Sequence, residues 1–412
     1  MFKKRAVWIE AAYVFILSRI VVVFFSYVAA SILPVDHSTE VFNCFSTPGK
    51  CFLMWDRYDV NSYIALAEHG YHSLRETAFF PLWPALLRIF AIPFGDNILA
   101  YTALGIVLAN LFFYLALVLL YLLVLELYGD QQVAVRALYY IAFAPYAIFF
   151  FIGYTESLFL FCCLFTFFCL QRALQKGQMV YWLLAGIGGF CASLSRSQGI
   201  FLLVPYGLVF IQCYLWPLTH PLERSEWRTL FQFNIWRQRF VQTNWHEKFL
   251  ALLPLLLVPM GLGLYMFYLW RTKGDPLAFS AAEVVWGRTG AMPWYTVHLA
   301  LKNLFIDNTL QVQNLLNLLS VFVCLAVLIA GVRRLPLYYT LFAALLFVFP
   351  LLYPWGSVDP LASIPRYILV IFPVSIFLAT VKSPRFEKAY LAFIVSFFIV
   401  FVMLFTLHYW VA

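Results

Sequence analysis

Charged residues are scarce in this sequence. Of its 412 residues only 11% are Asp, Glu, Lys or Arg, whereas 64% are hydrophobic and 20% are aromatic. Charged residues make up about a quarter of an ordinary soluble globular chain. The composition therefore excludes a water-soluble protein, a disordered chain, a collagen and a small disulfide scaffold.

Uncharged stretches recur along the whole chain, and most are long enough to cross a bilayer. About 20 apolar residues in a helix span the ~30 Å hydrocarbon core. The stretches are apolar throughout, without the alternation of a barrel strand, which predicts helices. We therefore expect an all-α, polytopic membrane protein with about eleven transmembrane helices. The charge-free stretches are 97–125, 137–155, 177–195, 197–222, 249–270, 308–332, 335–358 and 389–412; segments near 8–33, 157–171 and 367–381 are shorter between their charges but are also counted as spans.

The net charge of +8 is explained by an uneven distribution of charged residues between the two sides of a membrane, and it does not indicate nucleic-acid binding. If Lys3, Lys4 and Arg5 are cytosolic and eleven spans alternate, the cytosolic segments hold 16 Lys/Arg against 6 Asp/Glu, and the outer segments hold 10 against 12. An excess of Lys and Arg in cytosolic loops orients membrane proteins. This threading predicts a cytosolic N-terminus, and it requires 79–95 to be interfacial or re-entrant. The cytosolic segments in this count are the N-terminus, 126–136, 172–176, 218–248, 333–334 and 382–388.

No second domain, low-complexity linker or internal repeat is visible. We interpret residues 1–412 as a single integral membrane domain with an outer-face loop at 34–96. The first apolar stretch exceeds the usual ~7–15 residues of a signal peptide and contains Arg19, so we expect a retained helix. The inner segment 218–248 combines Trp and Arg residues, which is typical of an interfacial anchor.

The eight cysteines divide into two groups. Cys44 and Cys51 bracket a Pro48-Gly49 turn on the outer side, where an oxidising compartment would allow a disulfide. Two free thiols in a reducing setting are the alternative. The other six lie in predicted spans and are interpreted as packing residues: Cys162, Cys163, Cys169, Cys191, Cys213 and Cys324.

Acidic residues cluster in the first outer loop. Apolar residues at helical spacing predict a short amphipathic helix that begins near Asp59 and ends at Gly70, lying on the membrane surface. An Asp at such a position commonly caps the helix, which is the structural alternative for Asp56 or Asp59.

Further polar groups reach the same outer face from distant parts of the chain. Arg196, Arg288 and Arg366 each stand between apolar segments, where an arginine is costly and usually has a partner or a ligand. Snorkelling to lipid headgroups is the alternative for each arginine alone. Three arginines on one face beside an acidic loop predict a polar site at the outer membrane boundary.

This combination favours phosphate chemistry. Arginine forks bind phosphate oxygens with paired charge-assisted hydrogen bonds, and a nearby carboxylate can take a proton from an attacking hydroxyl. The sequence has no ATP-binding loop, Rossmann fingerprint, zinc pattern, Gly-x-Ser-x-Gly elbow or recognisable divalent-cation spacing. We therefore expect no metal and no cofactor, and a polyprenyl-phosphate sugar as a donor that carries its own activation.

The first outer block resembles a known family. Asp59, Tyr63, the Ala67–Tyr71 segment and the Ala78–Pro84 segment (AFFPLWP) resemble the mannosyltransferases that add the second mannose of GPI anchors, and their prokaryotic relatives. Later blocks follow in the same order: Tyr154-Thr155-Glu156, Ser195-Arg196-Ser197-Gln198-Gly199 and Pro365-Arg366-Tyr367. The family shows Arg-Trp-Asp before this helix, and Tyr58 stands here in the place of that Trp. The family spacing favours Asp59 over Asp56 as the catalytic carboxylate, and both are retained as candidates.

The resemblance implies a GT-C-type glycosyltransferase. It implies a polyprenyl- or dolichyl-phosphate-mannose donor, a lipid or glycan acceptor on the outer or lumenal face, and inversion at the anomeric carbon. Location would be the plasma membrane of a prokaryote or the endoplasmic reticulum of a eukaryote. The expected roles are Asp59 as general base, Arg196 and Arg366 with Arg288 on the donor phosphate, Glu156, Tyr154 and Tyr367 at the substrate, and Phe80 and Trp83 packed on sugar or lipid.

Three other interpretations are kept. Phe80 and Trp83 also fit an interfacial aromatic belt. A transporter or flippase of a lipid-linked substrate would place its charges near the bilayer midplane and show repeat symmetry. The sequence instead gathers its charges at one face, which favours the enzyme. A scaffold that has lost catalysis is the third possibility.

Overall fold

The computed structural model describes residues 2–35, 51–95, 97–215, 245–306 and 310–411. Regular structure in these residues is helical, and the one β-type pairing among them is an isolated bridge between Arg288 and Trp355. The predicted all-α class is confirmed. The predictions for Cys44 and for most of 218–248 lie outside the described residues.

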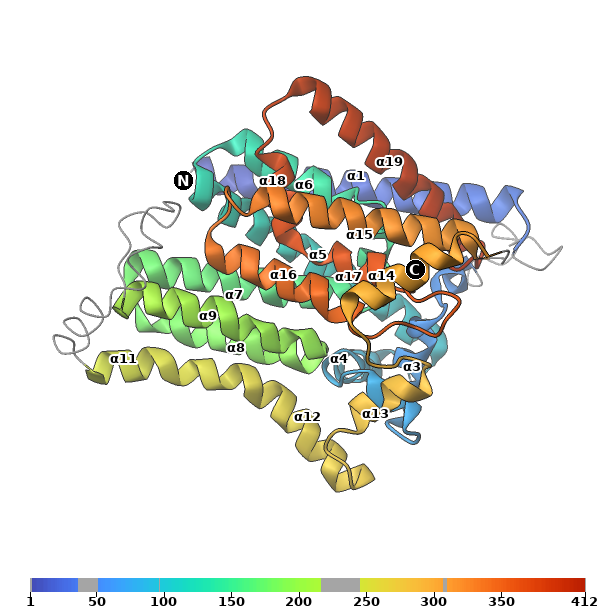
Figure 1. Ribbon diagram of the computed structural model, residues 1–412, viewed down its shortest axis with the longest axis horizontal. Coiled ribbons are helices and arrows are strands. Elements are labelled where there is room, and N and C mark those ends of the chain that lie inside the picture. Colours follow the sequence, from blue (N-terminus) through green and yellow to red (C-terminus); the bar gives the residue numbers. More distant parts are fainter. Residues whose placement is uncertain (1, 36–50, 96, 216–244, 307–309, 412) are drawn as a thin grey trace.

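Long helices pack side by side around one hydrophobic core that draws residues from Val7 to Val411 (Figure 1). The bundle is assembled through contacts of α5 with α6 and α7, of α7 with α8, of α8 with α12, and of α1 with α5 and α19. The helices are α1 (Phe2–Ile32), α5 (Ile98–Tyr128), α6 (Gln131–Ala142), α7 (Glu156–Lys176), α8 (Met179–Ser195), α9 (Leu203–Phe210), α11 (Trp245–Leu252), α12 (Leu257–Lys273), α15 (Gln311–Gly331), α16 (Leu337–Leu351), α18 (Phe372–Ala379) and α19 (Pro384–Thr406).

Seven of the described helical segments are long and apolar enough to cross a membrane. The chain is therefore a multi-pass integral membrane protein, while the predicted number of eleven spans is not confirmed. Each predicted stretch contains helix in its described part, but four of the stretches hold only shorter or interrupted helices. The seven segments are Val7–Ile32, Ile98–Tyr128, Glu156–Lys176, Ser197–Tyr214, Lys248–Lys273, Gln311–Gly331 and Pro384–Thr406.

Prolines and turns account for the interrupted stretches. The window 137–155 is divided because α6 ends at Ala142 before a turn that contains Pro145, and proline cannot continue a helix. The window 367–381 is divided between a short α17 (Ile364–Leu369) and α18, which has Pro373 in its first turn. The length of a charge-free stretch reflects hydropathy only, so it does not reveal where the helix is broken.

The segment 79–95 forms a helix too short to cross a bilayer. It contains α4 (Leu82–Ala91), whose ten residues rise only about 15 Å. The geometry agrees with the interfacial or re-entrant interpretation of this segment.

Six cysteines are free thiols, as expected for packing residues, and four of them are buried. Cys51 is disulfide-bonded and almost completely buried. The pairing of Cys51 with Cys44 stays a prediction, because Cys44 lies outside the described residues.

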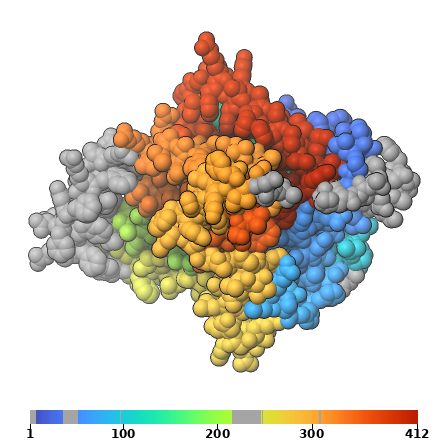
Figure 2. All heavy atoms as spheres, turned by 45° about the vertical axis from the view of Figure 1, so that its right-hand side comes forward, coloured from blue at the N-terminus to red at the C-terminus, as the bar shows by residue number. Residues whose placement is uncertain are grey.

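Short helices gather at one end of the bundle, at the right of Figure 1. They are α3 (Asp59–His69), α4, α13 (Ala278–Val285), α14 (Pro293–Asn303) and α17. Segments far apart in sequence meet there, and the space-filling view shows blue, yellow, orange and red atoms sharing this surface (Figure 2). The predicted helix from Asp59 to Gly70 is confirmed, since Gly70 follows the last residue of α3 with a φ of 80°.

The turn after α8 depends on a glycine. A Cβ on Gly199 would lie 2.3 Å from the backbone of Ala192 and Ser193, so Gly199→Ala forces this turn away from α8. Overpacking of this kind costs about 1–3 kcal/mol. We predict that Gly199→Ala lowers the melting temperature of the detergent-purified protein by a few degrees.

The matched control is Gly207→Ala in α9, where nothing lies within 4 Å of the added methyl group. An alanine there should leave the melting temperature unchanged or raise it, because alanine favours helix. Equal melting temperatures for the two variants would contradict the packing described for Gly199.

Candidate functional site

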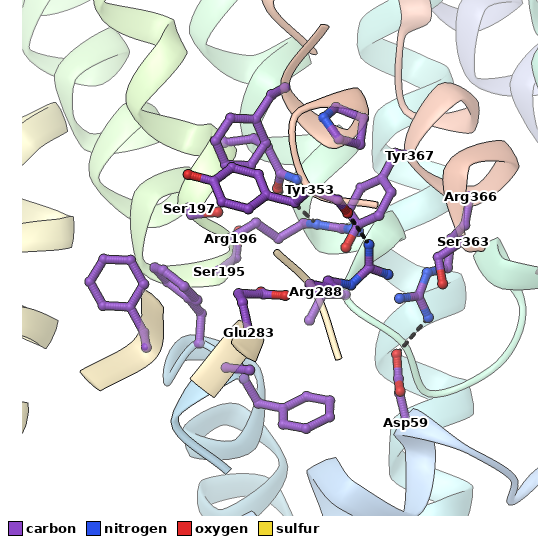
Figure 3. A pocket seen from close by; sticks show the side chains of 18 of the residues that line it. Asp59, Ser195, Arg196, Ser197, Glu283, Arg288, Tyr353, Ser363, Arg366 and Tyr367 are labelled. Carbon is purple, nitrogen blue, oxygen red and sulfur yellow. Dashed lines mark hydrogen bonds and ion pairs between the residues drawn. The ribbon is translucent and has the colours of Figure 1, made fainter. Parts of the chain in front are cut away.

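A cavity of about 370 Å³ opens where the short helices meet the bundle. Its lining combines charged, aromatic and apolar side chains from helices and loops spread over the whole sequence (Figure 3). Eight of the residues predicted for the site line it: Asp59, Phe80, Tyr154, Glu156, Arg196, Arg288, Arg366 and Tyr367.

A buried ion-pair network forms one wall of this cavity. The carboxylate of Glu156, only 1% exposed, lies 2.7 Å from Arg196 and 3.3 Å from Arg366. Arg366 also donates to Oδ2 of Asp59 at 2.5 Å (Figure 3). The side chains of Arg196 and Arg366 are 9% and 11% exposed and that of Asp59 is 25% exposed. Burying an ion costs several kcal/mol unless a partner compensates it. Here each charge has at least one partner of opposite sign, so the network holds Asp59 in a fixed position.

Asp59 stands in the first turn of α3, where the positive end of the helix dipole stabilises a carboxylate. Its backbone N–H donates to the hydroxyl of Tyr154 at 3.3 Å. The side chain of Asp59 pairs with Arg366, and no side chain caps the helix. Asp59 therefore does not cap the helix, and the helix-cap alternative is wrong for this residue.

The backbone around the network is strained. Among the described residues, three that are not glycine have positive φ: Tyr58 at 54°, Ser363 at 67° and His408 at 69°. Tyr58 directly precedes Asp59, and Ser363 directly precedes the helix that carries Arg366. Such conformations cost about 1–3 kcal/mol each and cluster at functional sites. A strained residue therefore stands just before Asp59 and another just before the helix of Arg366, the two partners of this ion pair.

A second ion pair lies on another side of the cavity. Arg288 Nε is 3.4 Å from the carboxylate of Glu283. The guanidinium also donates to the carbonyl oxygens of Tyr353 at 3.0 Å and Ala362 at 3.4 Å. Arg288 thereby ties the end of α13 to the last polar loop and presents its side chain at the cavity.

The surroundings of Glu283 raise its pKa. Burial is the main cause, and the negative charge of Asp59 adds to it, while Arg288 acts in the opposite direction. A carboxyl group with a raised pKa inside a cavity is a candidate for binding or proton transfer.

Two of the predicted site residues lie elsewhere. Asp56 is 7% exposed and is absent from the cavity lining. It accepts a hydrogen bond from Thr102 at 3.4 Å, and burial raises its pKa. Trp83 is fully buried and donates to the carbonyl of Gly153 at 2.9 Å. Asp59 therefore lines the cavity, whereas Asp56 and Trp83 are packed outside it.

Sequence reasoning missed several cavity residues. Glu283 stands in an alanine-rich segment, where nothing marks one carboxylate as more important than another. No site role was predicted for three tryptophans that line the cavity, although Trp286 was placed on the outer face beside Arg288: Trp286, Trp355 and Trp410. They come from two loops and the last residues of the chain, so only the folded arrangement brings them together.

Within the described ranges, no group of three or more His, Cys, Asp or Glu side chains is placed to hold a metal ion.

These features define a multi-pass helical membrane protein with a charged cavity at one end of its bundle. Comparison with known proteins adds the chemical class. Residues 78–227 match the family model described as dolichyl-phosphate-mannose-protein mannosyltransferase. Over 257 residues the chain is 27% identical to GPI mannosyltransferase 2 of Schizosaccharomyces pombe, an alignment that covers 60% of this chain and 50% of that protein.

Both sequence comparisons relate the chain to mannosyltransferases, so the resemblance seen in the motifs is confirmed. The chain spans about half the length of the curated relative it matches.

Solved structures with a similar course of the chain are larger. One is the archaeal oligosaccharyltransferase AglB from Archaeoglobus fulgidus, in complex with an inhibitory peptide and a dolichol-phosphate. It is 14% identical, with a TM-score of 0.46 over 97% of this chain and 55% of that one. Another is ArnT from Cupriavidus metallidurans bound to undecaprenyl phosphate, which is 13% identical, with a TM-score of 0.48 over 91% and 61%.

The shared carboxylate of Glu156 should dominate the stability of this end of the molecule. Glu156→Gln removes the carboxylate that pairs with Arg196 and leaves Arg366 with Asp59 as its acidic partner. Breaking a buried pair costs about 3–5 kcal/mol. We predict a clear fall in melting temperature, measured in detergent by the thermal unfolding of the purified variant.

The control is Glu387→Gln, which removes a half-exposed carboxylate 3.7 Å from Arg136. Exposed pairs contribute at most about 1 kcal/mol, so this variant should unfold close to the unmodified protein. If Glu156→Gln is no less stable than Glu387→Gln, the network does not hold the site together.

Proposed function

We propose that this chain is a membrane glycosyltransferase of the GT-C type. It transfers mannose, or another hexose, from a polyprenyl- or dolichyl-phosphate sugar to a hydroxyl group of a lipid-linked or glycan acceptor. The reaction takes place on the outer or lumenal face and inverts the anomeric carbon. The match to mannosyltransferases supports the reaction class.

One observation carries the proposal: Asp59, Arg196, Arg288 and Arg366 line the same cavity as a group of apolar side chains. The apolar part is built by Ile200, Phe201, Leu262, Phe279, Phe349 and Pro350. Several of these residues belong to membrane-length or apolar helices. A donor whose phosphate is attached to a long hydrocarbon needs this combination of cations and apolar surface.

Asp59 is the proposed general base. Arg366 engages Oδ2 of its carboxylate, so Oδ1 is the oxygen that takes the proton from the acceptor hydroxyl. The acceptor oxygen then bonds to the anomeric carbon of the sugar as the bond from that carbon to the phosphate oxygen breaks. The departing polyprenyl phosphate carries away the electron pair. A single displacement of this kind produces inversion.

The arginines divide the remaining work. Arg288 is the proposed principal phosphate ligand, because its acidic partner Glu283 has a side chain that is 37% exposed and can give way to a donor. Arg196 and Arg366 share the buried Glu156. They contribute positive potential at the leaving phosphate, and Arg366 also positions Asp59. Stabilisation of charge as it develops in the transition state usually contributes most of an enzyme's rate enhancement.

The proposed topology keeps the N-terminus in the cytosol and the cavity outside. The membrane would be the plasma membrane of a prokaryote or the endoplasmic reticulum of a eukaryote.

Sugar transfer by the purified protein tests the proposal. A short-chain polyprenyl-phosphate mannose, labelled in the sugar, is incubated with total membrane glycolipid and the protein, and the label is followed into glycolipid. We predict that Asp59→Asn lowers the rate by about 10²–10⁴-fold, the usual contribution of a general base. Asp56→Asn should stay within tenfold of the unmodified rate, because Asp56 lies outside the cavity.

The reverse pattern, with Asp56→Asn inactive and Asp59→Asn active, would move the base to the other carboxylate. If the folded protein consumes neither this donor nor a polyprenyl-phosphate glucose, the proposed transferase function is wrong. A transporter of lipid-linked substrates then becomes the better explanation.

Arg288 should affect donor recognition through the geometry of its guanidinium. Arg288→Lys keeps the charge but loses the fork that donates to two carbonyl groups and can grip phosphate. We predict a rise of roughly tenfold in the KM for the donor, equivalent to about 1.4 kcal/mol. Initial rates at varied donor concentration measure the change.

Arg271→Lys is the matched control, since Arg271 is exposed near the end of α12 and does not line the cavity. An unchanged KM for the donor in Arg288→Lys would argue against a phosphate at this arginine.

A further inference from the structure

Three tryptophans form an arc on the wall of the cavity: Trp286, Trp355 and Trp410. The indole N–H of Trp355 donates to the carbonyl oxygen of Trp286 at 2.5 Å. The rings of Trp355 and Trp410 have centroids 5.9 Å apart. The rings of Trp355 and Trp410 are therefore neighbours, and the Trp355 side chain contacts the backbone of Trp286, although the three residues come from separate segments of the chain.

The arc reaches the proposed base. The ring of Trp410 meets the ring of Tyr58 edge-on at 5.0 Å, and Tyr58 directly precedes Asp59. The Tyr58 hydroxyl donates to the carbonyl of His408 at 2.6 Å. Both Tyr58 and His408 have positive φ. The segment that carries Trp410 is therefore packed against Tyr58, the residue before Asp59.

The arc differs in origin from the apolar part of the cavity. Its tryptophans stand outside the seven candidate spans, in loops and after the end of α19. The apolar part includes Phe201 and Leu262 from candidate spans. A lipid-attached donor fits the apolar part, which leaves the arc for the acceptor, whose hydroxyl must meet Asp59.

The arc suits a hexose ring. A pyranose has a face of C–H groups, which packs on the flat surface of an indole, and a rim of hydroxyls, which needs polar partners. Tryptophan supplies a large apolar surface with one N–H donor. Glu283 and Arg288 line the same cavity and supply an acceptor and donors of hydrogen bonds. A cavity with mostly apolar walls and a few polar groups is the usual form of a ligand site.

Trp410 has one hydrogen-bond donor that is unsatisfied among the described residues. Its indole N–H is enclosed and has no hydrogen-bond partner in the described part of the chain. A buried donor left without a partner costs about 1–3 kcal/mol. A hydroxyl bound at the cavity would give this N–H an acceptor once the ring turns toward it.

We propose that Trp286, Trp355 and Trp410, with Glu283, form the subsite for the hexose ring of the acceptor. The proposal rests on the proposed function and deepens it, because it makes the acceptor a carbohydrate whose ring lies on the arc while one hydroxyl meets Asp59.

Binding of a simple sugar by the full chain tests the subsite without any sugar transfer. The probes are methyl α-D-mannopyranoside and methyl α-D-glucopyranoside, followed by saturation-transfer NMR with purified protein in detergent. At least one probe should bind the unmodified protein, with saturation strongest on the C–H groups of one ring face. Trp410→Ala should weaken that binding roughly tenfold, and Trp410→Phe, which keeps an aromatic face, should restore most of it.

Two further variants separate binding from folding. Trp355→Ala removes the side chain of a residue that is 37% exposed, so it should weaken sugar binding with only a small fall in the melting temperature. Trp294→Phe alters a tryptophan that is 70% exposed and outside the cavity, and binding should not change. The subsite is wrong if neither probe binds, or if Trp410→Ala and Trp355→Ala bind as well as Trp294→Phe.

Donor consumption is measured on the same preparations. Loss of probe binding in the arc variants supports the subsite even if no donor is consumed. In that case the proposed transferase function is wrong, while the sugar-binding site still stands. If donor is consumed, the arc variants should raise the KM for the glycolipid acceptor and leave the KM for the donor unchanged. A rise in the KM for the donor instead would assign the arc to the donor sugar and overturn the proposal.

Discussion

One buried carboxylate organises the functional end of this protein. Glu156 pairs with Arg196 and Arg366, and Arg366 in turn holds Asp59. In a chain with so few charges, each of these ions would be very costly alone, so the four depend on one another. The consequence is geometric: parts of the chain separated by up to 307 residues are fixed around one cavity, with its proposed base immobilised.

The backbone is distorted at the same places. Tyr58 precedes the proposed base, Ser363 precedes the helix of Arg366, and His408 precedes the segment that carries Trp410. The packed helices of the bundle form a rigid frame. The strained residues lie where short segments leave this frame and turn toward the cavity. A site made in this way combines the stability of packed helices with the placement freedom of loops, where binding residues commonly stand.

The sequence was informative where a local pattern carries the structure, and less so where tertiary contacts decide it. Helical spacing and Gly70 predicted α3, because both signals are local. The gathering of Asp59, Arg196 and Arg366 followed from the cost of charge beside a membrane. The number of spans did not follow, since Pro145 and Pro373 interrupt stretches that look continuous in hydropathy. Glu283 and Trp410 carry no local signal, because neighbours from distant segments give them their place at the cavity.

The most direct test of the central claim is a structure of the protein with a short-chain polyprenyl-phosphate mannose bound. We expect the phosphate to lie beside Arg288 and Arg196, with the lipid along Phe201 and Leu262. The anomeric carbon should then lie between the phosphate and Asp59, open to attack from the side of Asp59. A phosphate placed outside the cavity, or an anomeric carbon shielded from Asp59 by its own phosphate, would contradict it.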